Sequence, residues 1–150
     1  FLNRGAEAKF EDATARVFGD ARFYAPVIKV RDVNRDGRAD VFVGSTFETQ
    51  SGLFLGAEGG KFRDASAELL PQAAGNIGDV EFGDVDGDGD LDLVLAEWGN
   101  GSPMKNEGGR TQLWLNDGAG KFSDATAERM PDVLVRFCWE LEFVDVDNDL

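Results

Sequence analysis

Apolar and polar residues alternate in short runs along most of this chain, which is the pattern of β-strands. In the clearest stretch the runs fall at about 79–83, 91–96, 111–115 and 121–124. An apolar period of two indicates strands with one buried face, and the Gly, Asn and Asp clusters between the runs indicate turns. The residues at 116–120, Asn-Asp-Gly-Ala-Gly, favour a tight hairpin between the last two runs. The pattern therefore predicts a four-stranded antiparallel unit.

This unit is repeated along the chain. The motif Lys-Phe-x-Asp-Ala-Ser/Thr-Ala occurs three times, and its phenylalanines, Phe10, Phe62 and Phe122, are 52 and 60 positions apart. Four-stranded units that recur every 50 to 60 residues are typical of β-propeller blades. A solenoid of stacked hairpins is the alternative. Because Phe82, Trp114 and the three phenylalanines occupy repeated strand positions, we expect all five in the core.

The repeats divide the chain into two whole units and parts of two others. We expect the end of one blade at 1–26, a blade at 27–78, a blade at 79–139 and the start of the next blade at 140–150. A propeller typically closes with at least about four blades. We therefore predict an all-β fold, a partial β-propeller of four-stranded antiparallel blades, whose partners include the remaining blades of a longer protein.

An acidic loop at 84–92 reads Asp-x-Asp-x-Asp-Gly-x-x-Asp. Alternate side chains of a curling loop can converge on one point, and a main-chain carbonyl adds a further oxygen. Ca²⁺ takes six to eight oxygen ligands in flexible geometry, which suits this donor set better than the smaller shell of Mg²⁺. The candidate metal ligands are Asp84, Asp86, Asp88, Asp92 and the carbonyl of Asp90. The alternative is a solvated turn in which Asp and Gly serve only the backbone geometry.

Two further loops follow the same pattern. The loop at 32–40 keeps the ligand positions with Asp32, Asn34, Asp36 and Asp40. Asn34 removes one charge and two arginines add positive charge nearby, so we expect weaker cation binding there. The third loop supplies half a site, with the candidate ligands Asp145, Asp147 and Asp149.

An EF-hand loop opens with a similar sequence but closes with a carboxylate at its twelfth position. Here that position is Val43 in the first loop and Leu95 in the second. The flanking residues alternate as strands do and show no helical period. A helix-loop-helix site is therefore excluded on two independent counts.

The units resemble FG-GAP/VCBS repeats, the blades of the integrin α-chain head and of many bacterial surface and secreted proteins. The likeness is carried by Phe-Gly-Asp-Val-Asp-Gly-Asp-Gly-Asp-Leu-Asp-Leu at 82–93, followed by Leu-Trp-Leu-Asn-Asp-Gly at 113–118 and by Phe122. It implies a seven-bladed propeller with calcium as the bound ion. It also implies that Asp90 and Arg38 would each bind the ion through the main-chain oxygen.

Composition and charge narrow the classes of function. The formal charge of −14, from 29 acidic and 15 basic residues, disfavours a nucleic-acid partner because phosphate binding needs clustered Lys and Arg. There is no histidine, which removes His-dependent catalysis and zinc binding. The single cysteine, Cys138, excludes an internal disulfide, and we expect it in a buried strand. No apolar run reaches the roughly 18 residues of a membrane span.

The place for a partner is indicated by the one connection whose length differs between units. In an up-and-down sheet the second-to-third connection lies on the face opposite the acidic loops, and in the later unit it is longer, at 97–110. This loop contains Trp98 and several hydrogen-bonding groups. Variable loops on a rigid scaffold often carry recognition, so we expect a protein or carbohydrate ligand there. The alternative is that Trp98 packs between blades.

We expect a calcium-binding module that acts in extracellular recognition, cell adhesion or scaffolding and is not an enzyme. Millimolar calcium outside cells suits weak sites, so an extracellular, cell-surface or periplasmic location is expected. The alternative is a catalytic or non-catalytic portion of a secreted polysaccharide-active enzyme built on the same propeller. A third possibility is a spacer in which calcium is purely structural.

Overall fold

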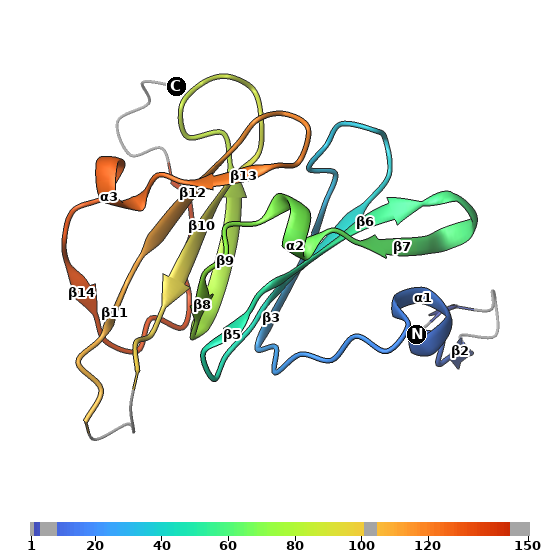
Figure 1. Cartoon of the computed structure of the whole chain (residues 1–150), viewed down its shortest axis with the longest axis horizontal. Coiled ribbons are helices and arrows are strands. Elements are labelled where there is room, and N and C mark those ends of the chain that lie inside the picture. The colour runs from blue at the N-terminus through green and yellow to red at the C-terminus, as the bar shows by residue number, and fades with distance from the viewer. Residues whose placement is uncertain (1, 4–8, 101–104, 145–150) are drawn as a thin grey trace.

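The computed structural model describes residues 2–3, 9–100 and 105–144. In it the chain forms two four-stranded antiparallel sheets (Figure 1). The first sheet contains, in spatial order, β3 (Val27–Arg31), β4 (Asp40–Gly44), β6 (Gly52–Ala57) and β7 (Lys61–Asp64). The second contains β9 (Ile77–Gly83), β10 (Asp92–Glu97), β12 (Gln112–Asn116) and β13 (Phe122–Asp124). Each sheet is an up-and-down meander, so the predicted four-stranded antiparallel units are confirmed.

Short strand pairs and one-turn helices accompany the two sheets. Two-stranded pairs join β1 (Leu2–Asn3) to β2 (Phe10–Glu11), β5 (Thr49–Gln50) to β8 (Ala74–Gly75), and β11 (Gly109–Arg110) to β14 (Leu134–Val135). The helices are α1 (Thr14–Phe18), α2 (Ser66–Leu69), α3 (Thr126–Arg129) and the 3-10 turn η1 (Glu58–Gly60). In the described ranges no helix has the length and apolar character needed to cross a membrane.

The one-turn helices come from the repeated motif, although the strand pattern alone did not predict them. In the first sheet the Asp64 carboxylate accepts a hydrogen bond from the Ser66 amide (2.9 Å), which turns the chain out of β7. The Ser66 hydroxyl oxygen then accepts the amide of Leu53 in β6 (2.9 Å). Thr126 repeats both contacts in the second sheet. In each sheet the motif therefore ends the fourth strand and connects the residues that follow it to the third strand by a hydrogen bond.

The main core lies between the two sheets. Leu93 pairs with Phe82 on one side and with Trp114 on the other, so all three side chains share one face of the second sheet. Phe42 of the first sheet meets this face, with ring centroids 6.3 Å from Phe82 and 6.4 Å from Trp114. Phe122 joins the same buried cluster. The prediction that Phe82, Trp114 and Phe122 are core residues is therefore confirmed.

Two sequence-based predictions of burial were wrong. Phe10 is 64% exposed, because β2 pairs only with β1 and no described sheet packs over it. Cys138 is partly exposed and lies outside any strand, beside the backbone of Gly78. Phe62 is intermediate: it is partly buried and stacks on Phe18 at 5.1 Å. Position in the repeat does not determine burial, because burial depends on which surface lies opposite.

The connections gather at two ends of the molecule. The loops between β3 and β4 and between β9 and β10 lie at one end, together with the turn between β12 and β13 (Figure 1). The small pairs β5–β8 and β11–β14 lie at the other end. This arrangement follows from the meander order of the strands. The acidic loops and the loop that carries Trp98 therefore face in opposite directions.

Candidate metal site in the acidic loops

Three carboxylates converge in the loop between β9 and β10. One oxygen from each of Asp84, Asp86 and Asp88 lies within 4.8 Å of the others, and all three residues are exposed. In water two unit charges at such a separation repel by about 1 kcal/mol. A divalent cation among them would replace that repulsion with attraction, and carboxylate oxygens are the donors that Ca²⁺ prefers.

The loop backbone holds these side chains in place. The two carboxylate oxygens of Asp84 accept the amides of Gly87 (2.8 Å) and Gly89 (2.9 Å). Both glycines have positive φ, 77° and 86°, which L side chains rarely adopt. Asp88 accepts the amide of Asp90 (2.8 Å). The loop therefore curls so that alternate aspartates approach one another, as its sequence predicts.

Asp92, the last acidic residue of the pattern, points into the protein instead. It is fully buried, and its two oxygens accept the amides of Val85 (3.0 Å) and of Asn116 in β12 (2.9 Å). Burial raises the pKa of Asp92, and the hydrogen bonds from these amides oppose the rise. The structure thus gives Asp92 the role of closing the loop onto the sheet and does not place its carboxylate with the other three.

The Asp90 side chain makes a contact that its sequence position did not indicate. Its carboxylate pairs with the guanidinium of Arg35, 2.6 Å away on the first acidic loop. Arg35 also donates to the carbonyl of Gly89. The Asp90 carboxylate lies against Gly118, where a Cβ would fall 2.5 Å from Oδ2. The predicted use of the Asp90 carbonyl as a ligand stays a prediction, while its side chain links the two loops.

The loop at 32–39 has the same backbone arrangement but a different charge balance. Asp32 accepts the amides of Asp36 (3.2 Å) and Gly37 (2.8 Å), much as Asp84 does in the other loop. The carboxylate of Asp36, however, is 2.5 Å from the guanidinium of Arg38 and also accepts a hydrogen bond from the side-chain amide of Asn34 (3.2 Å). Protein groups therefore already satisfy Asp36, which supports the expectation of weaker cation binding.

Asp40 closes the first loop as Asp92 closes the second. It is almost completely buried and accepts the amides of Val33 (3.0 Å) and of Gly56 in β6 (2.8 Å). Burial raises its pKa, against the opposing effect of these two hydrogen bonds. Within the described ranges the only cluster of three carboxylates is the one in the second loop. The predicted ligands Asp145, Asp147 and Asp149 lie outside the described residues.

Sequence reasoning missed three residues at this end of the molecule. The sequence indicates Arg35 only as a positive charge near the first loop and gives no signal for Arg129, which lies 3.6 Å from the Asp86 carboxylate. The sequence places Asn116 in the hairpin turn, yet its side-chain amide donates to the carbonyls of Val33 (2.9 Å) and Leu91 (3.1 Å). Such contacts join residues far apart in the sequence, so the repeat pattern contains no local signal for them.

Repeated antiparallel sheets with an Asp-rich first connection define a β-repeat protein. Residues 32–95, which run from the first acidic loop into β10, match the family model described as FG-GAP-like repeat. This part of the chain is therefore an FG-GAP-like repeat, and the resemblance seen in the sequence is confirmed over these residues. No curated protein matched the chain.

Proposed function

We propose that this chain is a calcium-binding repeat module that acts in extracellular recognition, adhesion or scaffolding. The observation that carries the proposal is the convergence of Asp84, Asp86 and Asp88 within 4.8 Å in a loop of an FG-GAP-like repeat. The two sheets are proposed as blades of a propeller whose other blades belong to a longer protein. The proposed role is binding and not catalysis.

The donor chemistry favours calcium over other ions. The three converging groups are carboxylates, and the chain contains no histidine. The site is exposed, and a main-chain carbonyl and water can complete the irregular shell that Ca²⁺ accepts. Exposed sites of this kind bind calcium with dissociation constants of about 10⁻⁴ to 10⁻³ M in extracellular modules. We propose an extracellular, cell-surface or periplasmic location, for which this is the matching affinity range.

Calcium binding is tested by thermal unfolding of the 150-residue chain in EDTA and in 10 mM CaCl₂, together with calorimetric titration. For a dissociation constant in the range above, saturation adds about 1.4 to 2.7 kcal/mol to the free energy of unfolding. This raises the midpoint by several degrees at this chain length. Asp86→Asn is expected to abolish most of the increase. Asp86 is the best target because no described residue donates a hydrogen bond to its carboxylate, so the loop backbone keeps its contacts.

The matched control is Asp32→Asn in the other acidic loop. Asp32 occupies the position of Asp84 and accepts two backbone amides, and Arg38 already neutralises the adjacent Asp36. Loss of these two amide contacts lowers the midpoint with and without calcium alike, so the variants are compared by their calcium-dependent increase. We expect this variant to retain most of the calcium-dependent increase in midpoint. An unchanged midpoint of the wild-type chain between EDTA and calcium would overturn the proposal, as would an Asp86→Asn variant that responds to calcium like the wild type.

A further inference from the structure

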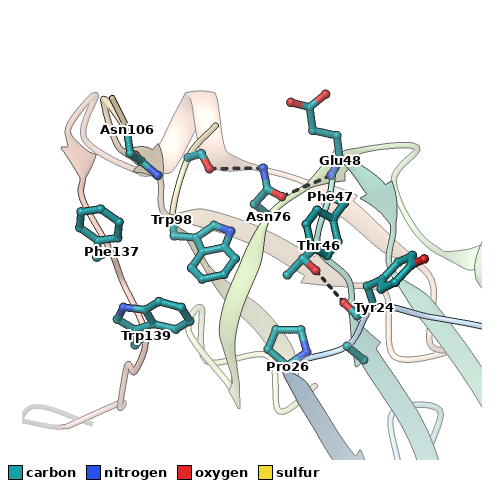
Figure 2. Close-up of a pocket in the computed structure, with 12 residues that line it drawn as sticks. Tyr24, Pro26, Thr46, Phe47, Glu48, Asn76, Trp98, Asn106, Phe137 and Trp139 are labelled. Atoms are coloured by element: carbon teal, nitrogen blue, oxygen red, sulfur yellow. Dashed lines mark hydrogen bonds between the residues drawn. The ribbon is translucent and has the colours of Figure 1, made fainter. Parts of the chain in front are cut away.

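An open cleft of about 790 Å³ lies at the end of the molecule opposite the acidic loops. Its walls come from the segment before β3, the turn after β4, Asn76 between β8 and β9, the connection from β10 to β11 and the chain that follows β14 (Figure 2). Both sheets therefore contribute to it. Its volume is in the range of sites for small ligands, about 300 to 1,000 Å³.

Aromatic side chains stand on both sides of this cleft. Trp98 and Trp139 pack edge to face with ring centroids 4.2 Å apart, and Tyr24 and Phe47 do so at 5.1 Å. Figure 2 shows the two pairs facing each other across Asn76. Trp139, Tyr24 and Phe47 are 57%, 67% and 73% exposed. Within each pair one ring supports the other, and flat ring surface remains open to a ligand.

The backbone beneath these rings adopts conformations that are unfavourable for bulky residues. Phe47, Glu48 and Phe137, which all line the cleft, have φ of 57°, 56° and 56°. In the described part of the chain the only other non-glycine residue with positive φ is Arg35. Strain of this kind gathers at functional sites, where the surrounding structure holds a side chain in a required position.

A buried amide fixes the floor of the cleft. Asn76 is 8% exposed and accepts the amide of Glu48 (3.3 Å). Its own amide group donates to the carbonyl of Gly99 (3.3 Å) and to the side chain of Asn100 (2.7 Å). One side chain thus ties the turn after β4 to the segment after β10. The two aromatic walls are held at a fixed separation, which is what a preorganised binding site needs.

The charge of the lining indicates the class of ligand. Among the described residues that line the cleft none is positively charged, and Glu48 carries the only formal charge. With a net charge of −14, the chain would repel acidic ligands. The Asn106 side-chain oxygen accepts the amide of Gly108 (2.7 Å), and Figure 2 shows its nitrogen turned toward Trp98. The cleft therefore offers flat apolar faces and a neutral hydrogen-bond donor.

We propose that this cleft binds a neutral oligosaccharide. A sugar ring has an apolar face of C–H bonds that stacks on an aromatic ring and a rim of hydroxyls that bonds to amides, which matches Trp139, Tyr24 and Asn106. A folded protein partner would need a surface of about 800 Å² on each side, whereas an open cleft of this volume suits a short chain of sugar rings. The inference rests on the proposed function, since it supplies the ligand class for that recognition module.

The test uses the 150-residue chain on a panel of immobilised neutral gluco-, manno-, galacto- and N-acetylglucosamine oligosaccharides. Sulfated and uronic-acid oligosaccharides and a proline-rich peptide serve as the competing ligand classes. The strongest neutral ligand is then titrated in solution by tryptophan fluorescence. We expect Trp139→Ala and Tyr24→Ala to weaken binding at least tenfold with an unchanged unfolding midpoint. Phe10→Ala, which removes an equally exposed aromatic ring outside the cleft, is expected to bind like the wild type.

The outcomes separate this inference from the calcium proposal. No binding to any neutral oligosaccharide overturns the inference, even if calcium raises the unfolding midpoint. Preferred binding of the acidic oligosaccharides or the peptide overturns it too, as does equal binding by Trp139→Ala and Phe10→Ala. Neutral-glycan binding that depends on Trp139 supports it, and this result stands even if calcium leaves the unfolding midpoint of the wild-type chain unchanged.

Discussion

Replacing Phe122 with alanine is expected to lower the free energy of unfolding by about 3 to 5 kcal/mol, because a large buried side chain is lost and a cavity remains. Phe122 is 4% exposed and belongs to the cluster between the two sheets. The same substitution at Phe10, at the corresponding position of another repeat, is expected to cost less than about 1 kcal/mol because that ring is 64% exposed. Phe62, partly buried against Phe18, should fall between them.

This series is measured by urea unfolding followed by circular dichroism, in EDTA so that metal binding does not contribute. The three variants make the same chemical change at the same position of the repeat, so differences among them report the surroundings alone. Equal losses at Phe10 and Phe122 would contradict the arrangement of the sheets described above. A loss that increases with burial, from Phe10 through Phe62 to Phe122, is the expected result.

The repeat unit could be predicted from the sequence because its strands are set by local rules. Alternation of apolar residues fixes which positions face inward, and Asn-Asp-Gly-Ala-Gly at 116–120 supplies the backbone conformations of a tight turn. Both signals lie within a few residues of the structure they specify. The predictions that Phe10 and Cys138 are buried were wrong because burial is not a local property. It depends on which distant surface covers each residue.

The candidate metal site could also be predicted only as far as it depends on local sequence. The spacing of Asp84, Asp86 and Asp88 brings their side chains to one side of a curling loop, which is a local property. The pattern treats Asp92 as an equivalent residue, but its carboxylate is drawn to two amides, one of them 24 positions away in β12. Whether a carboxylate faces a metal site or accepts hydrogen bonds from backbone amides depends on the tertiary structure. The spacing of acidic residues along the chain does not distinguish these two cases.

The two ends of the molecule are connected by the same core. Asn116 and the pair Arg35–Asp90 join the loops of the two sheets at one end. At the other end Asn76 links the turn after β4 to the segment after β10. Both sets of contacts cross from one sheet to the other. Their role is therefore to fix the relative position of the sheets, on which the shape of the cleft depends.

Asp92→Ala is expected to lower the free energy of unfolding by about 2 to 4 kcal/mol. The reason is not the charge itself, since burial raises the pKa of Asp92 and so disfavours its ionised form in the folded chain. The loss comes from the amides of Asn116 and Val85, which would be left without their acceptor. Each unsatisfied buried amide costs about 1 to 3 kcal/mol, and the partly exposed Val85 amide should lie at the lower end of that range.

The matched control is Asp117→Ala in the turn between β12 and β13. The Asp117 carboxylate also accepts two backbone amides, those of Ala119 (2.9 Å) and Lys121 (3.1 Å), but both contacts are exposed and water can replace them. Its removal should cost less than about 1 kcal/mol. Both variants are unfolded with urea in EDTA. Equal losses would mean that the Asp92 amides find water when the carboxylate is removed, so Asp92 would not be the residue that fixes the acidic loop to the sheet.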